Sequence, residues 1–230
     1  MSHQDYLDYL DGKPRYKGVQ SFLKSREISL PYGSPADEPG RETVCGLGNR
    51  KNELFLEVLR EDGARQFNDA VEKLRRWRKH GVKTAIVSSS KNCEEVIRTA
   101  GIEDLFDVRV DGMVSAERNL TGKPAPDIFL EAARELEALP HRCVVFEDAI
   151  SGVQAGARGK FAFVVGVGRE GKKRDLYENG ADIVVESFDE IELFRNTEME
   201  PYFTQSLPSV FADESKFNSI LPPNKVPVLF

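Results

Sequence analysis

The sequence predicts an α/β protein with a Rossmann-like, doubly wound parallel sheet and a helical cap subdomain. Three observations lead to this fold. Segments with helical spacing alternate with short β-rich runs between about residues 67 and 195. The run 143–146 contains no polar residue, which is typical of a parallel strand covered on both faces. Residues 1–66 show helical spacing without such runs, so we expect a separate helical cap there.

Helices and strands are expected to alternate along the core. Ala70, Val71, Leu74 and Trp77 have helical spacing, and Gly81 then leads into the β-rich run 82–87. Gly101 closes the next helix as its C′ residue. The other expected helices cover residues 94–100, 127–138 and 152–157, and the other expected strands cover residues 106–110, 143–146, 163–167 and 182–185. Ligands of such sheets bind beyond the carboxyl ends of the strands.

The two ends of the chain differ from the core. In the cap, helical spacing appears near residues 6–10, 19–23 and 52–60, around a Pro/Gly-rich loop at 31–40. From residue 196 onward the apolar density falls and prolines accumulate, so we expect 196–230 to be a linker or tail that leads to a possible second domain. Its last five residues, 226–230, are apolar and β-prone. They are expected to be a loose tail or the opening strand of another domain.

Composition excludes several classes of protein. The 230 residues are 40% hydrophobic with a formal net charge of -6, which argues against a broad nucleic-acid-binding face. The longest apolar run, 161–167, is far shorter than the roughly 20 residues that span a bilayer. The three cysteines are widely spaced and lack a C-x-x-C pair, so neither a disulfide framework nor a zinc site is expected. We therefore expect a cytoplasmic protein that binds neither nucleic acid nor membrane.

Three polar clusters carry the candidate chemistry, each placed where an apolar run ends or a helix begins. The first contains Ser88, Ser89, Ser90, Lys91 and Asn92 after a buried strand. Hydroxyl and backbone N–H groups at such a place can grip phosphoryl oxygens. The alternative is that these serines only end the strand and cap the following helix.

The second and third clusters supply charge. Lys123 lies in the rigid segment Gly-Lys-Pro-Ala-Pro-Asp, where its ammonium could neutralise a transferring phosphoryl group. The alternative is a solvated loop lysine. Glu147 and Asp148 follow a buried strand, and two adjacent carboxylates there repel each other unless a cation such as Mg²⁺ compensates them. The alternative is that they cap the next helix.

Together these clusters resemble the haloacid dehalogenase superfamily of phosphatases and phosphomutases, most closely its β-phosphoglucomutase-like branch. The resemblance covers about residues 5–191. It implies that Ser88 binds the transferring phosphoryl group, that Lys123 stabilises it, and that Asp148 binds Mg²⁺ with Glu147 beside it. It also implies six substrate-binding residues: Ser89, Ser90, Lys91, Asn92, Arg15 and Lys51. Of these, Ser90 and Asn92 would contact a second phosphate. The two cap residues, Arg15 and Lys51, match a phosphate clamp and a residue that guards substrate choice, and the alternative for them is ordinary surface cations.

The chain departs from this family in its first motif, a strand that leads into Asp-x-Asp-Gly. Asp8 and Asp11 imitate the motif with the wrong spacing and without a preceding buried strand. Asp111 follows an apolar strand but lacks a partner Asp two residues before it. We therefore expect the first strand and the nucleophile to be missing. Since that strand would be central in the sheet, its neighbours are expected to have unpaired edges.

The resemblance implies Mg²⁺-dependent conversion of β-glucose 1-phosphate to glucose 6-phosphate through an aspartyl-phosphate whose aspartate is absent from this chain. The chain alone is then expected to be inactive. The alternatives are a sugar-phosphate phosphatase of the same superfamily and a non-catalytic protein that binds sugar phosphates. The simplest account is a fragment of a longer fusion, in which residues 223–230 approach the first strand of a trehalose-phosphatase domain.

Overall fold

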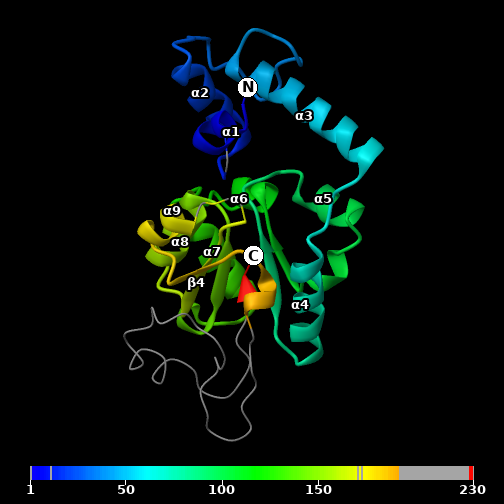
Figure 1. Ribbon diagram of the computed structural model, residues 1–230. Helices are drawn as coiled ribbons and strands as arrows, with labels where there is room; N and C mark the ends of the chain where they lie inside the picture. Colours follow the sequence, from blue (N-terminus) through cyan, green and yellow to red (C-terminus); the bar gives the residue numbers. More distant parts are fainter. Residues whose placement is uncertain (1, 11, 170, 172, 192–227, 230) are drawn as a thin grey trace, which may run out of the picture.

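The computed structural model describes residues 2–10, 12–169, 171, 173–191 and 228–229, and within them a six-stranded sheet forms the core (Figure 1). The strands are β1 (Thr84–Val87), β2 (Val108–Val110), β3 (Val144–Glu147), β4 (Phe163–Val167), β5 (Ile183–Val185) and β6 (Val228–Leu229). They lie in the order β2-β1-β6-β3-β4-β5, and every neighbouring pair is parallel. This confirms the expected α/β fold with a parallel sheet.

Helices cover both faces of this sheet. One face packs against α4 (Asn68–Lys79), where the ring of Trp77 lies 5.4 Å from that of Phe146 in β3. The opposite face packs against α7 (Asp127–Glu135) and α8 (Ile150–Arg158), and Val145 of β3 is fully buried there. Burial on both faces explains why β3 contains no polar residue before its last position.

The remaining core elements are short. They are the helices α5 (Cys93–Thr99), α6 (Gly112–Glu117) and α9 (Lys173–Glu178) and the 3₁₀ turns Glu103–Leu105, Pro140–Arg142 and Phe188–Glu190. Helices α6 and α9 were not expected. Helix α6 begins because Asp111 caps it: its Oδ1 accepts the N–H groups of Met113 at 2.8 Å and Val114 at 3.1 Å.

Three helices form the cap, which lies above the carboxyl ends of the strands (Figure 1). They are α1 (His3–Tyr9), α2 (Arg15–Ser25) and α3 (Val44–Asp62). A small apolar cluster around Val19, Leu23 and Val44 holds α2 against α3. Helix α3 begins earlier than expected because the hydroxyl of Thr43 accepts the N–H of Gly46 at 2.9 Å.

Residues 228–229, which the structure describes, form a strand of the sheet. Val228 pairs with Thr84 of β1 and with Val144 of β3, and Leu229 pairs with the next residue of each strand. Strand β6 therefore fills the centre of the sheet, and the prediction of unpaired edges on its neighbours is wrong at these positions. The rest of the expected linker, 196–227, lies outside the described residues.

Two expectations drawn from composition can be compared with the structure. Among the described residues, none of the helices has the length and apolar character that crossing a membrane requires. Cys45, Cys93 and Cys143 are free and buried. Burial raises the pKa of the Cys93 thiol to about 11 and that of the Cys143 thiol to about 12.

Candidate functional site

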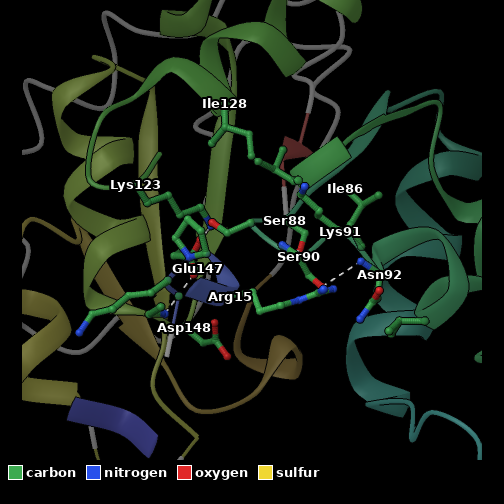
Figure 2. A pocket seen from close by; sticks show the side chains of 18 of the residues that line it. Arg15, Ile86, Ser88, Ser90, Lys91, Asn92, Lys123, Ile128, Glu147 and Asp148 are labelled. Carbon is green, nitrogen blue, oxygen red and sulfur yellow. Dashed lines mark hydrogen bonds and ion pairs between the residues drawn. The ribbon is translucent and has the colours of Figure 1, made fainter. Parts of the chain in front are cut away.

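A cavity of about 1110 Å³ is lined by residues of both the cap and the carboxyl ends of the strands. All the side chains that the sequence suggested for the site line it: Arg15, Lys51, Ser88, Ser89, Ser90, Lys91, Asn92, Lys123, Glu147 and Asp148. Figure 2 shows Lys123, Glu147 and Asp148 on one side, the serine segment on the other, and Arg15 between them. Residues far apart in the sequence thus surround a single cavity.

The serine segment forms a tight turn directly after β1. The hydroxyl oxygen of Ser88 accepts the N–H of Ser90 at 3.1 Å, and the hydroxyl oxygen of Ser90 accepts the N–H of Asn92 at 3.1 Å. Helix α5 has no side-chain cap at its N-cap residue, so these hydroxyls shape the turn and do not cap the helix. Each of them keeps a proton that it can donate to a phosphoryl oxygen.

Gly112 holds this turn from behind. Its N–H donates to the carbonyl of Ser90 at 3.0 Å. A Cβ atom on Gly112 would lie 2.7 Å from the carbonyl oxygen of Ser89 and 2.9 Å from the backbone nitrogen of Lys91. Only glycine therefore fits without moving the turn. The adjacent Asp111 is 1% exposed and caps α6, so it is a structural residue.

Lys123 and Glu147 form a buried ion pair at the base of the cavity. Nζ of Lys123 lies 2.5 Å from Oε2 of Glu147, and the two side chains are 6% and 7% exposed. The ammonium also lies 4.8 Å from the centre of the Phe129 ring. Lys123 is therefore not a solvated loop lysine, and its charge is held in place from two sides.

The second oxygen of Glu147 is also occupied. Its Oε1 accepts the N–H of Ala149 at 3.1 Å, and helix α8 has no side-chain cap at its N-cap residue. A Cβ atom on Gly152 would lie 2.0 Å from Cδ of Glu147, so α8 needs glycine there to make room for this carboxylate. Glu147 therefore holds Lys123 with one oxygen and the backbone of the N-cap residue of α8 with the other.

The fit of the site to a magnesium ion rests on Asp148. Its side chain is exposed and lines the cavity. The oxygens of Glu147 bind Lys123 and the N–H of Ala149. In the part of the chain that the structure describes, there is no group of three or more His, Cys, Asp and Glu residues that could hold a metal. Mg²⁺ is often held by only one or two carboxylates together with substrate phosphate and water. Asp148 fits such a site.

Asn52, which the sequence analysis did not single out, links the cap to the core. Its Oδ1 accepts from Nη2 of Arg15 at 2.7 Å and from Nδ2 of Asn92 at 2.6 Å. Desolvation and the positive charge of Arg15 lower the pKa of Lys51. Two cations so close together favour an anion between them. A polar residue on a helix surface has no pattern that marks this role, and its position directly after Lys51 is the single hint in the sequence.

Comparisons with known proteins add to this geometry. Residues 8–160 match the family model described as haloacid dehalogenase-like hydrolase. A β-phosphoglucomutase from Mycobacterium tuberculosis (strain CDC 1551 / Oshkosh) is 47% identical over 190 residues, which cover 81% of this chain and 72% of that protein. A protein described as an uncharacterized glycosyl hydrolase from the H37Rv strain is 38% identical over 185 residues, which cover 80% of this chain and 14% of that protein.

Among solved structures, the crystal structure of a β-phosphoglucomutase from Clostridium difficile has a TM-score of 0.66. It is 24% identical, and the match covers 84% of this chain and 78% of that one. This likeness concerns the fold.

Proposed function

Because this chain belongs to the haloacid dehalogenase-like hydrolase family, we propose that it binds sugar phosphates as a β-phosphoglucomutase does and, once a reacting carboxylate is supplied, converts β-glucose 1-phosphate to glucose 6-phosphate with Mg²⁺. The observation that carries the proposal is the convergence of the ten suggested residues on one cavity. The 47% identity to a mycobacterial β-phosphoglucomutase supports the choice of substrate.

The serine turn and Lys123 bind the transferring phosphoryl group. The hydroxyl of Ser88 and the N–H groups of the turn donate to phosphoryl oxygens. The ammonium of Lys123 lies opposite them and compensates negative charge that grows during transfer. Glu147 is a positioning residue, since it acts by holding Lys123. A magnesium ion on Asp148 would supply further compensation of the phosphate charge.

A second phosphate is proposed to bind nearer the cap. Arg15 and Lys51 supply positive charge from the cap, while Ser90, Lys91 and Asn92 face them from the core. A site that takes a phosphate at each end suits a sugar bisphosphate, which is the species a mutase must hold between its two transfers. This second cluster favours a mutase over a simple phosphatase.

The reacting carboxylate is not assigned to any side chain of the 230 residues. Asp111 is committed to the cap of α6, and its Oδ2 lies 3.3 Å from Nε of Arg109. Asp8 lies on α1 and does not line the cavity, and Asp11 lies outside the described residues. We therefore propose that this chain binds sugar phosphates but does not turn them over without an added carboxylate.

Calorimetric titration with β-glucose 1-phosphate and Mg²⁺ tests the proposal. Lys123→Ala should weaken binding on the order of tenfold or more, because a buried charge-assisted contact is lost. Lys79→Ala is the matched control, since Lys79 is exposed at the end of α4 and does not line the cavity. Equal affinities of Lys123→Ala and the parent chain would show that the sugar phosphate does not bind at the assigned site.

The products formed after a carboxylate is supplied separate the alternatives. Glucose 6-phosphate as the product supports the mutase. Release of inorganic phosphate without the isomer indicates a sugar-phosphate phosphatase. Retained binding with neither product indicates a protein that only binds sugar phosphates.

A further inference from the structure

Arg169 lines the cavity from the loop after β4, and the proposed function gives it no role. Its guanidinium is held by a carboxylate and lies over two aromatic rings. Nη2 lies 2.6 Å from Oδ2 of Asp69. Cζ lies 4.3 Å from the centre of the Phe67 ring and 5.9 Å from that of the Phe188 ring. A planar guanidinium can make these contacts together, whereas the compact ammonium of a lysine cannot.

Asp69 joins three segments of the core at one oxygen atom. Besides Nη2 of Arg169, its Oδ2 accepts the hydroxyl of Ser187 at 2.9 Å and the N–H of Phe188 at 2.9 Å. Asp69 lies in the first turn of α4, Arg169 follows β4, and the other two donors begin the last 3₁₀ turn. The side chains of Asp69 and Arg169 are 14% and 25% exposed, so this ion pair is only weakly screened by solvent.

This ion pair lies where the connection from the cap enters the core. Residues 63–67, here called the linker, join cap helix α3 to core helix α4. Phe67 ends the linker as the N-cap residue of α4, and its ring is exposed. Because burial does not hold this ring, its contact with the guanidinium matters more. The four residues Phe67, Asp69, Arg169 and Phe188, here called the Arg169 clamp, therefore fix the core end of the linker.

The other end of the linker is a glycine. Gly63 ends α3 with a φ of 74°, and a Cβ atom there would meet Cγ2 of Thr99 at 3.9 Å, an ordinary contact. Between the two ends, the side-chain amide of Gln66 donates to the carbonyl of Ala100. The direction in which α3 leaves the core therefore depends on the linker, whose core end is held by the Arg169 clamp.

The direction of α3 decides where the cap residues of the site lie. Lys51 and Asn52 are on this helix, and Oδ1 of Asn52 accepts Nδ2 of Asn92 in the core at 2.6 Å. A helix rises about 1.5 Å per residue, so Asn52 lies roughly 16 Å from Gly63, and a rotation of roughly 10° there moves Asn52 by about 3 Å. A shift of that size breaks the bond to Asn92 and displaces the ammonium of Lys51 from the serine turn.

We propose that the Arg169 clamp positions the cap for the second phosphate of the ligand, by holding the linker so that α3 keeps Lys51 and Asn52 within reach of the core. Arg169 is a positioning residue, because its guanidinium is engaged by Asp69 and acts through the linker. The inference rests on the proposed function for the ligand that the cap receives. The hold on the linker itself can be measured without a ligand.

A double-variant cycle measures the coupling between the clamp and the cap. Arg169→Lys keeps the positive charge in the cavity but loses the planar contact with Phe67. In calorimetric titration with β-glucose 1-phosphate and Mg²⁺, Arg169→Lys and Asn52→Ala should each raise the Kd on the order of fivefold. In the Arg169→Lys chain, Asn52→Ala should add less than about twofold. An unchanged Kd of Arg169→Lys, or a full fivefold effect of Asn52→Ala in both chains, overturns the inference.

The matched control is Arg174→Lys. Arg174 also pairs with a carboxylate, that of Glu178, but the pair is exposed and does not line the cavity. Its Kd should equal that of the parent chain, because exposed pairs contribute little.

Trypsin tests the linker in the chain without ligand. Arg65 lies in the linker and is exposed, so cleavage after it reports how often the linker opens. Arg169→Lys should be cut after Arg65 on the order of tenfold faster than the parent chain or Arg174→Lys. Cleavage after Lys79, at the end of α4, is the internal reference, because a general loss of stability accelerates both cuts. Equal cleavage after Arg65 in all three chains, or a parallel rise at both sites, overturns the inference.

The two measurements separate this inference from the proposed function. If no chain binds β-glucose 1-phosphate but Arg169→Lys is cut faster after Arg65 alone, the clamp on the linker stands and the proposed function fails. If the parent chain binds the sugar phosphate in a Lys123-dependent way and Arg169→Lys changes neither the Kd nor the cleavage, the proposed function stands and the inference fails.

Discussion

The buried ion pair between Lys123 and Glu147 yields the sharpest prediction about stability. The two side chains are 6% and 7% exposed, so removal of one leaves the other charge buried without its partner. Such a loss costs about 3–5 kcal/mol. Glu147 keeps the N–H of Ala149 and Lys123 keeps the ring of Phe129, so we expect the lower end, about 3 kcal/mol, for Lys123→Met or Glu147→Gln alone.

The double variant separates the pair from its surroundings. It leaves no unpaired charge, so its cost should fall well below the sum of the single costs, with a coupling of about 2 kcal/mol or more. Urea unfolding can be followed by the fluorescence of Trp77, the single tryptophan of the chain, which is 2% exposed and contacts Phe146 next to Glu147. If each single variant lost less than about 1 kcal/mol of the free energy of unfolding and the two losses simply added in the double variant, the pair would behave like an exposed one and the reasoning would be wrong.

Three further predictions concern the turn, the cap and the response to acid. Gly112→Ala should weaken phosphate binding on the order of tenfold because its Cβ displaces the serine turn. Gly18→Ala is the control: its Cβ would meet only ordinary contacts of 3.5 Å or more, so the affinity for β-glucose 1-phosphate, measured by calorimetric titration, should stay unchanged. Asn52→Ala removes the shared acceptor between cap and core and should make the binding free energy of β-glucose 1-phosphate less favourable by about 1 kcal/mol, which raises the Kd; an unchanged Kd would exclude this role. Burial raises the pKa of Asp69, but the bonds from Arg169 and from the start of the last 3₁₀ turn outweigh it and lower the pKa to about 2. The resulting stability, about 2 kcal/mol, is present above the unfolded pKa of about 4 and is lost as the pH falls through about 2, so unfolding curves of Asp69→Asn and the parent should converge in acid.

The sequence predicted most of the core because its elements follow from local patterns. Helical spacing and apolar runs placed α4, α7, α8 and β4 close to their observed bounds. Helices α6 and α9 have six residues each, too few for a recognisable period. The place of β6 could not be predicted because a short apolar run does not reveal which strands it will join.

The sequence indicated residues that line one cavity, but it did not indicate all of their contacts. Polar residues at the ends of parallel strands meet at one edge, which is why the serine turn and Glu147 could be expected to lie near each other. The grouping of Glu147 with the metal ligands did not foresee that both its oxygens are used by Lys123 and Ala149. Such pairings depend on side-chain geometry across separate loops, as does the link through Asn52.

The central place of β6 also makes the geometry of the site depend on residues that hold no polar side chain. Strands β1 and β3 are two strand spacings apart, about 9.6 Å, with β6 between them. Their carboxyl ends carry the serine turn and Glu147, so β6 sets the distance between the two halves of the proposed phosphoryl site. Leu229→Pro should therefore weaken binding of β-glucose 1-phosphate more than Leu229→Ala does, although neither changes a charge. Equal affinities of the two variants in calorimetric titration would show that the halves are held together without β6.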